Sequence, residues 1–168
     1  MPPRIFKRQD GYEPKDLMHF GLDHVNAAEE LLGKNASFFD SAGYLVHMGL
    51  ELLLKAWHLE SFGEFSGIHS LKELVNQLKI KGQQLNLSEE ENETLKIADA
   101  YGELRYPNPQ HGTEIGSDDW EKIDALLNRI WEQMPQVFDK YIKSIDPTRK
   151  GGRVLMERKI ESRRKNSG

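Results

Sequence analysis

One long apolar pattern in the first half of the chain restricts the fold more than any other feature. Between residues 38 and 60, apolar side chains recur at three- and four-residue spacing, which is the spacing of one helix face. These positions are Leu45, Val46, Gly49, Leu50, Leu53, Leu54 and Trp57. Because the face is wide, we expect this segment to be the central and most buried helix of a helical protein.

The same helical period dominates the rest of the sequence, and no strand-like alternation lasts long enough to compete. We expect a first helix over residues 14–32 and a short third helix that ends near Lys81. A fourth helix over 88–105 and a last one from Asp118 to about Tyr141 complete the set. The predicted fold is all-α, an antiparallel, up-and-down bundle of four to five helices with a basic C-terminal extension.

Local signals mark where these helices begin and bend. Ser70 with Glu73, and Ser88 with Glu91, have the spacing of capping boxes. Pro135 lies inside the apolar seam of the last helix and is expected to kink it, because proline lacks the backbone donor.

Composition excludes several classes of site and predicts a cellular compartment. The 168 residues include no cysteine, so disulfides, thiolate zinc sites and cysteine nucleophiles are excluded. No apolar run approaches the roughly 20 residues of a membrane span, and the N-terminus lacks a signal-peptide core. We therefore expect a cytoplasmic protein without a metal site or cofactor.

Charge divides the chain into unequal parts. Residues 147–168 hold eight basic and two acidic residues, a net charge of +6, so residues 1–146 carry −10 of the overall −4. We expect a flexible N-terminal arm over 1–14, a helical bundle over 15–146 and a basic tail over 147–168. A basic tail can contact nucleic acid, fold back on the acidic body or merely aid solubility. The predicted contact residues are Arg149, Lys150, Arg153, Arg158, Arg163 and Arg164.

Three segments, taken together, resemble one known family. The first is residues 42–56, with Tyr44, Gly49, Glu51, Leu54, Lys55 and Ala56 at the characteristic positions. The second begins at His69 and reads His-Ser-Leu-Lys-Glu-Leu. The third is residues 100–107, an arginine-containing helix end around Arg105. In this order the segments resemble HEPN domains over roughly residues 15–145.

The resemblance implies both a fold and a choice of functions. HEPN domains are four- or five-helix bundles, usually homodimers. Many are metal-independent endoribonucleases of toxin–antitoxin or defence systems, which carry an Arg-x4–6-His motif. Others are non-catalytic partners of a nucleotidyltransferase. The expected partners are thus RNA or a nucleotide, a second subunit, and a nucleotidyltransferase or antitoxin.

Arg105 and His111 fit the spacing of the catalytic motif, with five residues between them. An arginine holds and stabilises a phosphate, and a histidine moves the proton of the 2′-hydroxyl or of the leaving oxygen. The expected product carries a 2′,3′-cyclic phosphate. Catalytic HEPN domains usually place a polar residue after the arginine, whereas Tyr106 follows here, and two prolines precede His111.

A non-catalytic interpretation therefore stays open beside the catalytic one, as does a structural helical adaptor. In the non-catalytic form the arginine caps its helix and pairs with Asp99 or Glu51. Glu51 either faces the cleft and orients Arg105, or pairs with Lys55 at the surface. His69 is interpreted as a helix-start residue, and His47 and His58 as packing or surface residues. Tyr101 is expected in the core.

Overall fold

The computed structural model describes residues 1–34, 39–105 and 117–144 of the chain. Within them lie six α-helices, two 3-10 helices and a two-stranded sheet. The long helices are α1 (Pro14–Lys34), α2 (Phe39–Phe62), α4 (Glu89–Ala100) and α5 (Ser117–Gln133), and the short ones are α3 (Leu71–Ile80) and α6 (Val137–Lys143). The strands are β1 (Ile5–Lys7) and β2 (Glu64–Ser66), and the 3-10 helices are η1 (Arg8–Asp10) and η3 (Tyr101–Arg105).

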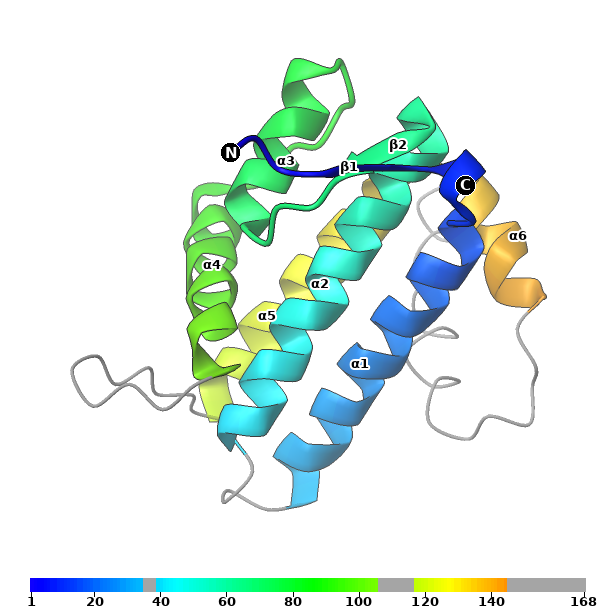
Figure 1. Cartoon of the computed structure of the whole chain (residues 1–168). Coiled ribbons are helices and arrows are strands. Elements are labelled where there is room, and N and C mark those ends of the chain that lie inside the picture. Colours follow the sequence, from blue (N-terminus) through cyan, green and yellow to red (C-terminus); the bar gives the residue numbers. More distant parts are fainter. Residues whose placement is uncertain (35–38, 106–116, 145–168) are drawn as a thin grey trace, which may run out of the picture.

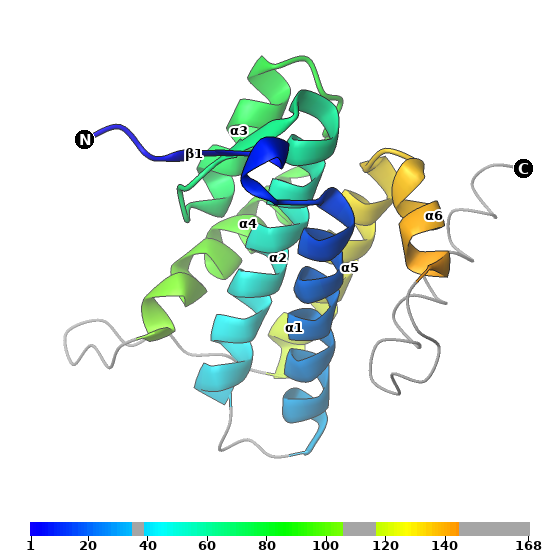
Figure 2. The same ribbon diagram turned by 45° about the vertical axis from the view of Figure 1, so that its right-hand side comes forward.

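The four long helices run alternately up and down, so the predicted antiparallel bundle is confirmed (Figure 1). Helix α2 lies between α1 and α4, and α5 lies behind it. Helix α3 and the small sheet lie at the end of the bundle where α2 finishes, and α6 stands beside α1 and α5 (Figure 2).

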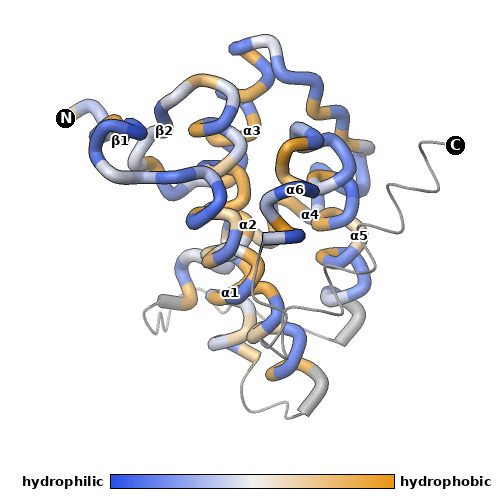
Figure 3. The backbone as a smooth tube through the Cα atoms, turned by 90° about the vertical axis from the view of Figure 1, so that its right-hand side faces the viewer, coloured by the Kyte–Doolittle hydropathy of each residue, from blue (hydrophilic) through white to orange (hydrophobic). Residues whose placement is uncertain are grey.

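Helix α2 is the centre of the core, as its wide apolar face predicts. Val46, Leu50, Leu53, Leu54 and Trp57 are all almost completely buried. Hydrophobic and hydrophilic stretches alternate along the other helices, each of which has only one inward face (Figure 3). Helix α2 also buries two charged residues, which is unusual: Glu51 and Lys55 are only 3% and 5% exposed.

Glycines allow α1 and α2 to approach very closely. A Cβ on Gly49 would lie 2.5 Å from Val25 Cγ2 and 2.8 Å from the Gly21 carbonyl oxygen. A Cβ on Gly21 would in turn lie 2.9 Å from the Gly49 carbonyl oxygen. The two backbones are thus in direct contact at this crossing, which fixes the position of α2 against its neighbour.

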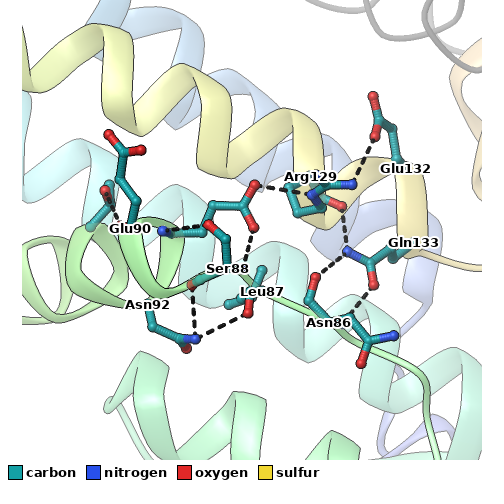
Figure 4. Close-up of polar contacts among 10 residues, drawn as sticks. Asn86, Leu87, Ser88, Glu90, Asn92, Arg129, Glu132 and Gln133 are labelled. Carbon is teal, nitrogen blue, oxygen red and sulfur yellow. Dashed lines mark hydrogen bonds and ion pairs between the residues drawn. The ribbon is translucent and has the colours of Figure 1, made fainter.

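Polar contacts join α4 to α5 at the start of α4. The predicted capping box is present: Glu91 N donates to Ser88 Oγ over 3.1 Å, and Ser88 N donates to Glu91 Oε2 over 2.8 Å. Arg129 Nε on α5 donates to the other Glu91 oxygen over 3.0 Å. Gln133 exchanges two hydrogen bonds with the backbone of Asn86 (Figure 4). These contacts set the orientation of α4, whose far end carries η3.

Two local features differ from the pattern read from the sequence. Within the expected N-terminal arm, residues 5–10 form secondary structure: β1 pairs antiparallel with β2, Phe6 opposite Phe65, and these two rings stack with centroids 5.2 Å apart. Three residues are too few to show alternation, so this strand left no pattern in the sequence. Pro135 ends α5 and a new helix starts at Val137, so the chain breaks where a kink was expected.

The break also changes which residues face the core. Ile123, Leu127, Ile130 and Met134 are buried, as the seam of α5 predicts. In α6, Phe138 and Ile142 are buried instead of Val137 and Tyr141, which are only partly covered. No helix among the described residues is long and apolar enough to cross a membrane.

Candidate functional site

An open pocket of about 650 Å³ lies where α2, the start of α3, the end of α4 and η3 meet. Its walls combine titratable side chains with two apolar ones. The lining residues are Tyr44, His47, Met48, Glu51, His69, Ser70, Lys96, Asp99, Ala100, Gly102 and Glu103. The volume is that of a site for a small molecule or for one or two nucleotides.

A buried carboxylate organises the wall of this pocket. Lys55, one helical turn further along α2, donates a hydrogen bond from its Nζ to Glu51 Oε1 over 2.5 Å. Glu51 also lies 3.0 Å from His69 Nδ1 and 3.5 Å from His47 Nε2. Three cationic or potentially cationic groups therefore surround one carboxylate. Their attraction offsets the desolvation cost of burying its negative charge.

His47 is held in one orientation by two acceptors. Its Nδ1 lies 3.0 Å from the carbonyl oxygen of Ala98, which can only accept, so Nδ1 carries a proton. In the neutral ring Nε2 would then turn a lone pair toward the Glu51 carboxylate. The doubly protonated ring instead turns an N–H toward it. The geometry therefore favours the imidazolium form of His47.

The pKa values of the two groups agree with this geometry. Burial by itself lowers the pKa of His47, but Glu51, the Ala98 carbonyl and the charge of Asp99 outweigh it and raise that pKa above 6.5. Burial raises the pKa of Glu51, but hydrogen bonds from His47 and Lys55 and the charges of Lys55 and His69 lower it to about 2. Glu51 is thus ionised at any physiological pH.

Asp99 fixes the start of α3 against the end of α4. Its Oδ1 accepts from Leu71 N over 2.7 Å, and its Oδ2 accepts from Ser70 Oγ over 3.0 Å. Ser70 Oγ in turn accepts from Glu73 N over 3.3 Å, the cap that the sequence predicts. His69 directly precedes this cap. Its place at the pocket rim is therefore set by α2, α3 and α4 together.

Gly102 gives His47 the space that it occupies. A Cβ on Gly102 would lie 2.8–3.1 Å from three atoms of the imidazole ring. The first turn of η3 therefore packs directly on His47, and η3 continues from this contact to Arg105. The backbone that carries Arg105 is thus tied to the buried charge network.

The HEPN domain profile matches residues 15–149, which is most of the chain. The chain belongs to the HEPN domain family. This membership connects it with nucleotide- or RNA-related function. No curated protein and no solved structure matches the sequence.

Of the residues predicted for a HEPN catalytic motif, the structure describes few. Arg105 is the last residue of η3, so its backbone follows the pocket-lining Gly102 and Glu103, but its side chain lies outside the described residues. Tyr106, His111 and the tail residues from Arg149 to Arg164 also lie outside them. The two carboxylates expected to support Arg105, Glu51 and Asp99, both line the pocket.

Several roles given to HEPN residues from the sequence need correction. Glu51 does pair with Lys55, but the pair is buried rather than at the surface. Asp99 holds the start of α3, a role that the sequence analysis did not assign to it. His69 binds a carboxylate rather than backbone groups. Of the two alternatives for His47 and His58, packing or surface, both residues have the packed one, and the ring of His58 contacts the Leu74 carbonyl oxygen over 2.9 Å. Tyr101 lies in the core, as expected.

Met48, Lys96, Glu103 and His47 line the pocket without having been predicted as site residues, and for His47 a sequence signal exists. His47, Glu51 and Lys55 are spaced four residues apart, so they must share one face of a helix. A charged row on an otherwise apolar helix predicts a buried network. Within the described part of the chain, no group of three or more His, Asp or Glu residues is arranged to hold a metal ion.

Proposed function

We propose that this HEPN protein binds RNA in the pocket beside η3 and cleaves it without a metal ion. Arg105 would contact the scissile phosphate and His111 would act as an acid or base. The observation that carries the proposal is the position of the pocket. It opens directly beside the short helix that ends at Arg105, the first residue of the Arg-x5-His motif.

The chemistry of the pocket supports a ribonucleotide ligand. Tyr44 and Met48 offer a partly apolar wall that suits a base, Lys96 offers a donor that suits a phosphate, and His69 offers a ring nitrogen that suits a ribose hydroxyl. Asp99 and Glu103 add acceptors at the same rim. Mixed lining of this kind favours a nucleotide over a purely anionic ligand, because the acidic and basic groups roughly balance.

The direct test is incubation of the purified protein with a mixed RNA in EDTA, followed by analysis of the new ends. We expect 2′,3′-cyclic phosphate ends from the wild type. Arg105→Ala and His111→Ala should each lower the cleavage rate by about 10²- to 10⁴-fold. His24→Gln, which alters an imidazole on α1 outside the pocket, is the matched control and should cleave normally. Cleavage by both motif variants at the wild-type rate would contradict the proposed site.

A second candidate function is nucleotide binding without cleavage, as in the HEPN subunits that partner a nucleotidyltransferase. The two prolines between Arg105 and His111 favour it as a sequence feature, because proline is unfavourable inside the helical turn that would join the two motif residues. In this case a nucleotide would bind in the same pocket and no new RNA ends would form in the EDTA experiment.

The basic tail and a second subunit extend the proposal. We infer that the protein acts in the cytoplasm as a homodimer with an antitoxin or nucleotidyltransferase partner, and that the tail adds nonspecific contacts to RNA phosphates. Deleting residues 147–168 should then weaken RNA binding and reduce its dependence on salt, because fewer counterions are released. An unchanged salt slope in a binding titration would exclude a role for the tail.

A further inference from the structure

The most unusual polar contact in the molecule joins a buried carboxylate to an exposed imidazole. Glu51 is 4% exposed at its side chain, whereas the side chain of His69 is 77% exposed. The contact between them, 3.0 Å from Glu51 Oε1 to His69 Nδ1, links the interior to the pocket rim. An exposed histidine held in this way is fixed at one ring nitrogen and free at the other.

The partners of Glu51 determine which nitrogen of His69 carries the proton. Glu51 is already paired with Lys55 and faces His47, so it is ionised and can only accept from His69. His69 Nδ1 must therefore donate. In the neutral ring this leaves Nε2 as a lone-pair acceptor, on the side of the imidazole away from Glu51.

The support behind the pair is rigid. Lys55 and His47 hold Glu51 from the turns of α2 on either side, and the Asp99 contacts hold the residue that follows His69. The remaining charged groups at the pocket are Lys96 and Asp99 on α4 and Glu103 in η3. Lys96 is occupied by Glu93 over 2.6 Å, so His69 is the more available nitrogen base at the rim.

We propose that Glu51 and His69 form a carboxylate–imidazole dyad, in which His69 Nε2 accepts the proton of a ribose 2′-hydroxyl bound in the pocket. This inference deepens the proposed function and rests on RNA binding at the same site. It assigns the base to His69, a residue that the Arg-x5-His motif does not include. Glu51 is a positioning residue, since it reaches the ligand only through His69.

The step balances without any reactant beyond solvent water. The 2′-oxygen gives its proton to His69 Nε2 and uses the released electron pair to form a bond to phosphorus. The bond from phosphorus to the 5′-oxygen breaks, and that oxygen takes a proton from solvent water. The products are a 2′,3′-cyclic phosphate and a free 5′-hydroxyl, and the protonated His69 returns its proton to the solvent.

The first experiment reads the dyad directly and does not need cleavage. Nitrogen-15 shifts of the His69 ring, measured by NMR where the ring is neutral, should show the Nδ1–H tautomer. Glu51→Asp should weaken this preference, and Glu51→Gln should abolish it if that variant folds. Adding an RNA oligonucleotide should shift the Nε2 resonance, and the matching 2′-deoxy oligonucleotide should not. An Nε2–H tautomer, or equal shifts with both oligonucleotides, would overturn the proposal.

The second experiment separates the dyad from the function on which it rests. His69→Gln changes an exposed side chain, so folding should be retained, and it should cleave RNA about 10²- to 10⁴-fold more slowly than the wild type. His24→Gln should match the wild type. Cleavage by His69→Gln at the wild-type rate would remove the base and leave the endoribonuclease standing. A wild-type protein that does not cleave would refute the endoribonuclease and with it the proton transfer, whereas the NMR result would still decide the dyad.

Discussion

Glu51 on α2 is the carboxylate on which the two pocket histidines converge. Glu51 is the only carboxylate among the described residues to which both His47 and His69 are drawn, and Lys55 compensates its charge from behind. A buried ion pair contributes little net stability, because desolvation offsets the attraction. The main effect of the buried Glu51 is to position the side chains of His47, Lys55 and His69, which all contact it.

Protonation of His47 should be visible in the stability of the protein. Because the folded pKa of His47 is raised, its favourable contribution is complete below its unfolded value of 6.5 and is lost as the pH rises through the folded pKa. The folded pKa of Glu51 is lowered to about 2, so its contribution is complete above about 4.5 and is lost as the pH falls toward 2.

We therefore expect His47→Gln to reduce the free energy of unfolding most between about pH 4.5 and 6.5, by about 1–3 kcal/mol. The difference from the wild type should shrink at higher pH. Urea unfolding at a series of pH values measures it. Comparison with the wild type cancels the opposite effect of His58, whose pKa is lowered by burial. A difference that grows above pH 7 would contradict the imidazolium assignment.

Gly102 offers a way to disturb His47 without changing any charge. In Gly102→Ala the new methyl group would meet the imidazole ring at 2.8–3.1 Å, so the ring or η3 must move. We expect a loss of about 1–3 kcal/mol in unfolding free energy and altered ring resonances of His47 in NMR spectra. Unchanged ring resonances would mean that η3 has moved instead of the ring. Because η3 lines the pocket, RNA binding should then be weaker.

The site could be predicted from the sequence only in part. The helix order follows from periodicity, and the resemblance to HEPN domains points to Glu51 and Asp99, both of which line the pocket. The Glu51–His69 contact does not, because the two residues lie on different elements joined by a strand and a loop. Spacing within one helix is readable from a sequence, whereas the distance between two elements depends on how they pack.

At the scale of elements, the crossing of α1 and α2 is the tightest contact in the bundle. Gly49→Ala would place a methyl group 2.5 Å from Val25 and 2.8 Å from the Gly21 carbonyl oxygen. A backbone atom cannot rotate away, so the helices must separate. We expect a loss of about 1–3 kcal/mol in unfolding free energy. Ser41→Ala, on an exposed position of α2, is the control and should change stability by less than about 0.5 kcal/mol.

Boundaries of elements were predicted best where a side chain makes the cap. Ser70 and Ser88 cap α3 and α4 as their spacing indicates. The end of α5 was predicted less well, because Pro135 permits either a kink or a break and the choice depends on tertiary packing. Phe138 and Ile142 decide it, since a new helix after the break buries both.

At the scale of the whole molecule, the N-terminal residues close one end of the bundle. Phe6 contacts Phe65 and Tyr12, with ring centroids 5.2 Å and 5.3 Å apart, and Lys55 Nζ lies 5.9 Å from the centre of the Phe65 ring. Arg8 adds a hydrogen bond of 3.1 Å to Glu60. The first strand therefore covers the side of the charge network that faces away from the pocket.

Removing residues 1–10 should accordingly destabilise the bundle and disturb Lys55. We expect a fall of several degrees in the melting temperature, equivalent to about 1–3 kcal/mol, because Phe65 loses its stacked partner. Circular dichroism on heating measures this, and Phe6→Leu, which keeps an apolar contact, should lose less. A truncated protein that melts with the wild type would show that the arm contributes nothing.

The pairing of β1 with β2 also has a consequence during synthesis. Ile5 is made before α1 and α2, whereas its partner Ser66 is made only after both. Until then the aromatic ring of Phe6 lacks Phe65, the ring on which it stacks in the folded protein. The nascent chain can form the β1–β2 pair only after α1 and α2 have been made and packed together. Pairing of the two strands therefore marks the point at which this helical hairpin is complete.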